Sequence, residues 1–241
     1  MNTTIILTGY QITSQIYAGN RTLVYRGIKE QDGCPVIIKV LQTRFPRSKE
    51  IFQLRNHYNI TRNLDLLSIP KTLALETYQN SYALVTEDCG SISLKDLLER
   101  EGELGTSPQK LALFLQLAIQ IAEALAGLYS HRIIHKDIKP ANILFNPATQ
   151  QIQLIDFSIS SLLPKETQSI QHITALEGTL AYIAPEQTGR MNRGIDYRSD
   201  FYALGVTCYE LLTGQLPFIS HNPIELVAWL DDNVPVQLDC D

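Results

Sequence analysis

The pattern of the sequence changes near residue 90. Before that point, β-branched and aromatic residues form five short runs separated by turn signals such as "AGN" and "QDG", which is typical of antiparallel strands. The five runs are residues 10–17, 22–28, 34–41, 72–78 and 81–87. Between the third and fourth runs, residues 48–67 carry apolar side chains at roughly helical spacing. We therefore expect residues 1–88 to form a small lobe, a five-stranded antiparallel sheet with one helix.

Residues 89–241 are predicted to form a second, mainly helical lobe. The segment 107–131 begins with Ser107 as a helix cap and Pro108 at the first helical position, and its apolar residues form a broad stripe. The segment 199–214 is apolar nearly all round and ends at Gly214, as expected of a buried helix. We also expect an extended element over 151–160 and a short helix over 223–230. The predicted fold class is α+β with two lobes.

Composition is that of a soluble globular protein. Of the 241 residues, 44% are hydrophobic and 19% are charged. The N-terminus has no signal-peptide pattern, and no run approaches the length of a membrane helix, so we expect no membrane segment. The four cysteines are scattered without a C-x-x-C pair, which favours reduced thiols and a cytoplasmic location over disulfides or zinc.

Charge is distributed unevenly along the chain. The net charge is −5, which gives no support for a nucleic-acid partner. No Lys or Arg follows Arg198, whereas seven acidic residues do. We expect such an acidic, base-free tail in a lobe whose last helices are missing, or in a fragment of a longer polypeptide.

The segment "IIHKDIKPANIL", residues 133–144, concentrates chemically active side chains between apolar flanks. Alone, it could be a polar turn, because Asp, Lys, Pro and Asn are all common in turns. Three more segments follow it in order: "LIDFS", "GTLAYIAPE" and "DYRSDFYALGVTCYELLTGQLPF". Together the four resemble the eukaryotic-type serine/threonine protein kinase family over nearly the whole chain. The resemblance implies a two-lobed kinase fold, here without its last helices.

The resemblance also implies roles for individual residues. Asp137 matches the catalytic aspartate that accepts the proton of the substrate hydroxyl, and Lys139 matches the lysine that neutralises the γ-phosphate of ATP. Asn142 and Asp156 match the two magnesium ligands. The implied cofactors are ATP and Mg²⁺, and the implied partner is a protein with a Ser or Thr acceptor.

Further residues match positions that bind the nucleotide in this family. Lys39, in the apolar run "VIIKV", resembles the strand lysine that binds the α- and β-phosphates; the alternative is an edge-strand lysine that faces water. Gly19 is the one glycine left in the phosphate loop, where Tyr17 and Thr22 occupy the other glycine positions. Backbone groups of Glu87 and Cys89 would meet the adenine, next to a gatekeeper at Thr86.

Two matches concern the support of the catalytic loop. Thr179 matches the threonine that bonds the catalytic aspartate. Asp200 matches the aspartate that holds the catalytic loop, although its position also allows it to cap the helix that follows.

The helix glutamate that normally pairs with the strand lysine is the main departure. The register places His57 there, and a histidine cannot replace a carboxylate in an ion pair with Lys39. Glu50 lies on a similar face, but two turns earlier. Either the pair is absent, or the helix has another register.

Other departures affect the activation segment. Lys136 replaces an arginine before Asp137, and Ser158 replaces the glycine of D-F-G. Glu186 lacks the arginine that pairs with it in the family, because no arginine follows Arg198. Possible phosphorylation sites are Thr167, Ser169 and Thr174.

Three functions follow from these matches. The first is a serine/threonine protein kinase domain, with activity weakened or lost if His57 and the shortened lobe matter. The second is a pseudokinase that binds nucleotide or regulates a partner. A small-molecule phosphotransferase is disfavoured, because Lys139, Thr179 and the A-P-E segment are features of protein substrate binding. The resemblance extends to kinase domains of large multidomain bacterial signalling proteins, so further domains of a longer polypeptide are expected partners.

Overall fold

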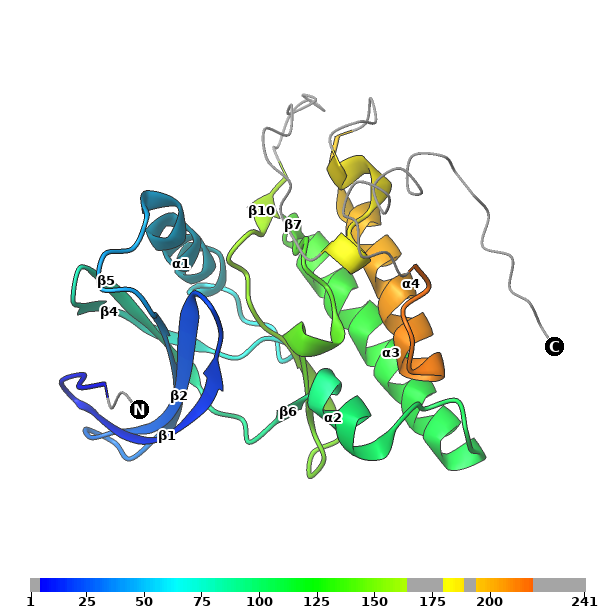
Figure 1. Ribbon diagram of the computed structural model, residues 1–241, viewed down its shortest axis with the longest axis horizontal. Coiled ribbons are helices and arrows are strands. Elements are labelled where there is room, and N and C mark those ends of the chain that lie inside the picture. The colour runs from blue at the N-terminus through cyan, green and yellow to red at the C-terminus, as the bar shows by residue number, and fades with distance from the viewer. Residues whose placement is uncertain (1–4, 164–179, 189–193, 219–241) are drawn as a thin grey trace.

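The computed structural model describes residues 5–163, 180–188 and 194–218. These residues form two lobes, a β-rich one that carries helix α1 and a helical one built on α3 and α4 (Figure 1). The α+β class is therefore confirmed. One cluster of buried apolar side chains lies in the sheet of the first lobe, and a larger one fills the second lobe and also includes Ile69 from the segment before β4. The predicted boundary between residues 88 and 89 falls in the connection between strands β5 and β6.

The first lobe is a five-stranded antiparallel sheet in the order β1-β2-β3-β5-β4. Its elements are β1 (Tyr10–Ala18), β2 (Thr22–Lys29), β3 (Pro35–Leu41), α1 (Ser48–Thr61), β4 (Thr72–Tyr78) and β5 (Ser81–Glu87). All five predicted strands and the helix are confirmed to within a residue or two, except that the helix ends six residues early. Strand β3 is central, and its buried side chains Val36, Ile38 and Val40 alternate along it, as the period of a strand requires.

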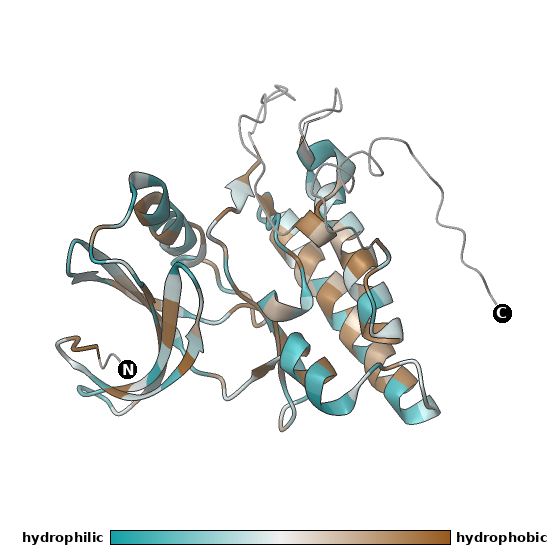
Figure 2. Ribbon diagram, viewed as in Figure 1, coloured by the Kyte–Doolittle hydropathy of each residue, from teal (hydrophilic) through white to brown (hydrophobic). Residues whose placement is uncertain are grey.

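The second lobe is built around two long helices. Its elements are β6 (Ile92–Ser93), α2 (Leu94–Glu101), α3 (Pro108–Ser130), β7 (Ile133–Ile134), β8 (Ile143–Asn146), β9 (Gln151–Leu154), β10 (Ser161–Leu162) and α4 (Tyr197–Thr213). Short 3₁₀ turns lie at Pro140–Asn142, Leu180–Tyr182 and Pro185–Thr188. Apolar colour is concentrated on α3 and α4, whereas α2 is largely polar (Figure 2).

The ends of these helices follow from local chemistry. Ser107 accepts a hydrogen bond from the Lys110 amide and Pro108 opens α3, as predicted. Gly214 ends α4 in the left-handed conformation, with φ 70°, which glycine adopts at little cost. Helix α4 begins two residues earlier than predicted, and its cap is Asp196, whose carboxylate accepts from the Arg198 amide. The alternative that Asp200 caps this helix is therefore wrong.

One prediction in this lobe was too long. The extended element expected over residues 151–160 ends at Leu154, because Asp156 takes φ 68° and turns the chain out of the strand.

Helix α3 is the one helix among the described residues that is long and apolar enough to cross a membrane by length and composition. Its residues Phe114, Leu117, Ile121, Leu125 and Leu128 are buried in the apolar cluster of the second lobe. This packing is that of the core helix of a globular lobe.

Candidate active site

The loop between β7 and β8 brings three of the predicted residues together. The Lys139 Nζ atom lies 2.7 Å from Asp137 Oδ2. The Asn142 side-chain amide donates to the same carboxylate oxygen at 2.7 Å and to the Asp137 backbone carbonyl at 2.8 Å. The 3₁₀ turn Pro140–Asn142 folds the chain back far enough for this contact. The Lys139 ammonium and the Asn142 amide thus both contact the Asp137 carboxylate, and all three residues are partly or fully buried.

Asp200 fixes the backbone of this loop from within α4. Its two carboxylate oxygens accept hydrogen bonds from the amides of His135 and Lys136, both at 2.7 Å. Asp200 is only 4% exposed, and burial raises its pKa even though both amides favour the charged form. Lys136 has φ 70°, a strained conformation for a residue with a side chain, and this anchor holds it there. The predicted structural role of Asp200 is the one its contacts support.

The buried imidazole of His135 joins the loop to the next segment. One ring nitrogen, Nε2, lies 3.0 Å from the Ile155 carbonyl, and the other, Nδ1, lies 3.3 Å from the Asp137 amide. A carbonyl only accepts and an amide N–H only donates, so these partners assign the neutral ring with its proton on Nε2. The ring also meets Phe157 edge-on, with centroids 4.7 Å apart.

Lys39 and Asp156 form an ion pair between the two lobes. Lys39 stands on the central strand β3, in register with Val24 and Leu84, so the alternative of an edge-strand lysine is wrong. Its Nζ atom lies 2.8 Å from Asp156 Oδ2. Burial would raise the pKa of Asp156, but the charge and hydrogen bond of Lys39, together with smaller contributions from His57 and Ser158, hold that pKa well below its usual range.

His57 lies beside this pair as a buried neutral ring. Burial, and next the charge of Lys39, lower the pKa of His57 to about 3. The ring packs edge-on against Phe157 at 5.7 Å, and its Nδ1 atom has no hydrogen-bond partner among the described residues. Glu50, the other carboxylate considered, accepts from the Arg47 amide and caps the start of α1. Lys39 is therefore paired with Asp156 and not with a carboxylate of α1.

Gly19, Glu87 and Cys89 are the remaining residues predicted to contact the nucleotide. A side chain at Gly19 would meet the Tyr17 hydroxyl, which lies 2.5 Å from the place a Cβ would take. The Gly19 amide bonds the Thr22 carbonyl at 2.9 Å, which closes the β1–β2 turn. In the connection to the second lobe, the Glu87 amide bonds the Lys71 carbonyl, and the Cys89 carbonyl accepts from the Asn146 side chain at 2.6 Å.

Two side-chain contacts were not expected from the sequence. The Asn56 amide of α1 donates to three backbone carbonyls just beyond Asp156, those of Phe157, Ser158 and Ser160. Glu186 accepts a 2.6 Å hydrogen bond from the hydroxyl of Ser199. Backbone carbonyls leave no trace in a side-chain pattern, and a serine is too common to stand out. Neither signal could have been singled out beforehand.

Several predictions lie outside the described residues. They are Thr179, the phosphorylation candidates Thr167, Ser169 and Thr174, and the helix over 223–230.

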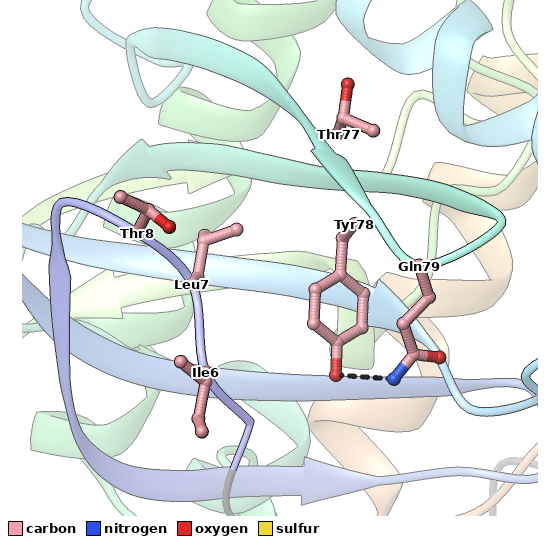
Figure 3. A pocket seen from close by; sticks show the side chains of 6 residues that line it. All are labelled: Ile6, Leu7, Thr8, Thr77, Tyr78 and Gln79. Atoms are coloured by element: carbon pink, nitrogen blue, oxygen red, sulfur yellow. Dashed lines mark hydrogen bonds between the residues drawn. The ribbon is translucent and has the colours of Figure 1, made fainter.

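The described cavity at the other end of the small lobe has a different character. It is lined by Ile6, Leu7, Thr8, Thr77, Tyr78 and Gln79, none of which carries a charge (Figure 3). The Gln79 amide donates to the Tyr78 hydroxyl at 3.0 Å. The lining of this cavity includes none of the predicted site residues.

Comparison with known proteins agrees with this geometry. The chain matches the protein kinase domain family over residues 10–235. It is 28% identical over 222 residues to a probable serine/threonine-protein kinase of Clostridium perfringens, which covers 91% of this chain and 31% of that protein. Against serine/threonine-protein kinase PknB of Mycolicibacterium smegmatis, identity is 33% over 141 residues, which covers 58% of this chain and 21% of that protein.

The family match covers far more than half of the chain, so this chain belongs to the protein kinase domain family. It spans about a third or less of the length of these curated relatives.

Proposed function

We propose that this chain is a serine/threonine protein kinase domain that transfers the γ-phosphoryl group of ATP to Ser or Thr hydroxyls of a protein. The observation that carries the proposal is the bonded set of Asp137, Lys139 and Asn142, with the Lys39–Asp156 pair between the lobes. The printed names of the relatives support the same activity.

Asn142 and Asp156 fit a magnesium ion. One oxygen of Asp156, Oδ1, is buried without a hydrogen-bond partner among the described residues, while Oδ2 binds Lys39. The Asn142 side-chain nitrogen is bound to Asp137, which turns the amide oxygen away from that carboxylate. Oxygen atoms of these two kinds are the ligands that Mg²⁺ takes. Bound Mg²⁺ would neutralise negative charge that develops on the transferred phosphoryl group.

The protein's own groups would do the remaining work. Asp137 would accept a hydrogen bond from the substrate hydroxyl, aim its oxygen and take up its proton. Lys139, 2.7 Å from that carboxylate, would lie between it and the γ-phosphate and offset the charge of both. Lys39 would hold the α- and β-phosphates.

Adenine would bind to the connection between the lobes. Because the Glu87 amide and the Cys89 carbonyl already have partners, the groups proposed for adenine are the Glu87 carbonyl and the Cys89 amide. Gly19 would lie over the phosphates, in a turn where the exposed Tyr17 side chain would have to shift to admit a larger residue.

A pseudokinase is the second candidate, and His57 favours it. A neutral buried ring stands where an active kinase has a carboxylate, and Lys39 has taken Asp156 as its partner. Such a chain would bind nucleotide without efficient transfer.

Phosphoryl transfer from labelled ATP to a generic basic substrate, with Mg²⁺ present, separates the two candidates. Asp137→Asn should lower incorporation by roughly a hundredfold or more, because it removes the proton acceptor. Asp65→Asn, an exposed aspartate of the first lobe, is the matched control and should have no effect. A wild-type chain without incorporation whose melting temperature still rises with Mg·ATP would contradict the kinase proposal and support the pseudokinase.

The wider setting is also proposed. The relatives are about three times as long as this chain, which supports further signalling domains in the same polypeptide as partners. Cys34, Cys89 and Cys208 are free, and this supports a cytoplasmic location.

A further inference from the structure

Asn56 makes an unusual set of contacts for a residue on a helix. Its side-chain nitrogen lies 2.9 Å from the Ser160 carbonyl, 3.2 Å from that of Ser158 and 3.3 Å from that of Phe157. The donor belongs to α1 of the first lobe, whereas the acceptors follow β9 of the second lobe. About a hundred residues of sequence separate the two.

The backbone carbonyls of this segment need hydrogen-bond donors. Asp156 has φ 68°, so the chain reverses there and the next residues run outside any strand or helix. Carbonyls in such a segment lose the partners that regular structure provides, and burying them unpaired is costly. The Asn56 amide group lies within hydrogen-bond distance of all three carbonyls, and the Phe157 carbonyl also accepts from the Ser160 amide at 3.3 Å.

We call the three hydrogen bonds from the Asn56 side chain to the Phe157, Ser158 and Ser160 carbonyls the Asn56 clamp. Its position suits it to a function. The neighbour of Asn56, His57, occupies the place of the carboxylate that would tie α1 to Lys39, and it contacts Phe157 only through its ring. Lys39 is bound by Asp156 instead. Hydrogen bonds therefore connect α1 to the ion pair indirectly, through the backbone of residues 157–160 that follows Asp156.

We propose that Asn56 is a positioning residue that fixes the turn at Asp156 against α1. By doing so, it sets where the Asp156 carboxylate stands for Lys39 and for a metal ion. This role replaces, through neutral hydrogen bonds, the ion pair that His57 cannot make. The proposal rests on the proposed function only for the metal; the clamp itself is independent of turnover.

Asn56→Asp is the sharpest test, because it keeps the shape and removes both donors. A carboxylate would face three carbonyl oxygens, which repel it. Asn59→Asp is the matched control, since Asn59 lies three residues further along α1 and is exposed. Asn56→Ala provides a second variant should the aspartate prevent folding, and Asn56→Gln tests rescue by another amide.

Two measurements on the whole chain read out the effect. The first is hydrogen–deuterium exchange of the segment 155–160. The second is the affinity for ADP by calorimetry, with and without Mg²⁺. We expect Asn56→Asp and Asn56→Ala to speed exchange roughly tenfold or more, the factor that corresponds to one lost hydrogen bond. The gain in ADP affinity from Mg²⁺ should fall by a similar factor, while binding without Mg²⁺ stays unchanged.

Asn59→Asp should leave both quantities as in the wild type, and Asn56→Gln should restore part of each. Exchange and Mg²⁺-dependent affinity within twofold of the wild type in Asn56→Ala would overturn the proposal. Failure of the proposed kinase activity is a separate result, because it concerns transfer to a substrate and leaves the exchange comparison intact.

Discussion

His57 should make the folded chain lose stability as the pH falls. The ordinary pKa of histidine is about 6.5, whereas burial and Lys39 lower the pKa of His57 to about 3 in the fold. Between these two pH values, His57 binds a proton in the unfolded chain but stays neutral in the folded chain. Acid therefore favours unfolding, and stability present above pH 6.5 is lost on the way down to pH 3.

The size of this effect follows from the two pKa values. At pH 5.5, an unfolded histidine is protonated about ten to one, while buried His57 stays neutral. The linkage relation then gives a loss of about 1.4 kcal/mol between pH 7.5 and pH 5.5. That is a measurable share of a stability of roughly 5–15 kcal/mol.

Urea unfolding of the wild type and of His57→Leu at pH 7.5 and 5.5, followed by circular dichroism, isolates the contribution. Leucine keeps an apolar contact with Phe157 but cannot titrate, and the other ionisable groups are common to both chains. The wild type should lose about 1.4 kcal/mol more than the variant over this interval. Equal losses in the two chains would refute the reasoning, since they would mean that His57 is protonated as easily in the fold as outside it.

Two further changes test the supports of the catalytic loop and the activation segment. Asp200→Asn places an NH₂ group against one of the two amides that the carboxylate binds, and should lower the unfolding free energy in urea by about 2–4 kcal/mol; a loss below about 1 kcal/mol would contradict the anchoring role. Ser199→Ala removes the donor to Glu186 and should cost about 1–2 kcal/mol, with faster hydrogen exchange over residues 183–187. Unchanged exchange in that segment would show that Glu186 is held by other contacts.

The sequence predicted those parts of the site that depend on local spacing. Asp137, Lys139 and Asn142 lie within six residues, so one short loop brings them together. Lys39 and Asp156 are 117 residues apart, and only the resemblance to a family placed them in one site. The strands were predictable because runs of β-branched and aromatic residues are separated by turn signals, although of the five strands of the first lobe only β3 comes close to regular alternation of burial.

What was missed has physical reasons. Helix α2 is only eight residues long, although Ser93 and Asp96 form a capping box that could have indicated it. The clamp at Asn56 depends on backbone carbonyls whose direction is set by φ at Asp156. Such an angle has no signature when the residue is not glycine.

The central position of β3 has a mechanical consequence. Lys39 is hydrogen-bonded into the sheet on both sides, so it moves only with the first lobe as a whole. Asp156 belongs to the second lobe, whose apolar cluster also takes in Ile69 from the segment before β4. The ion pair of Lys39 and Asp156 therefore couples the sheet of the first lobe to the turn at Asp156. A movement of that sheet relative to the second lobe must either break the ion pair or carry the turn at Asp156 along with it.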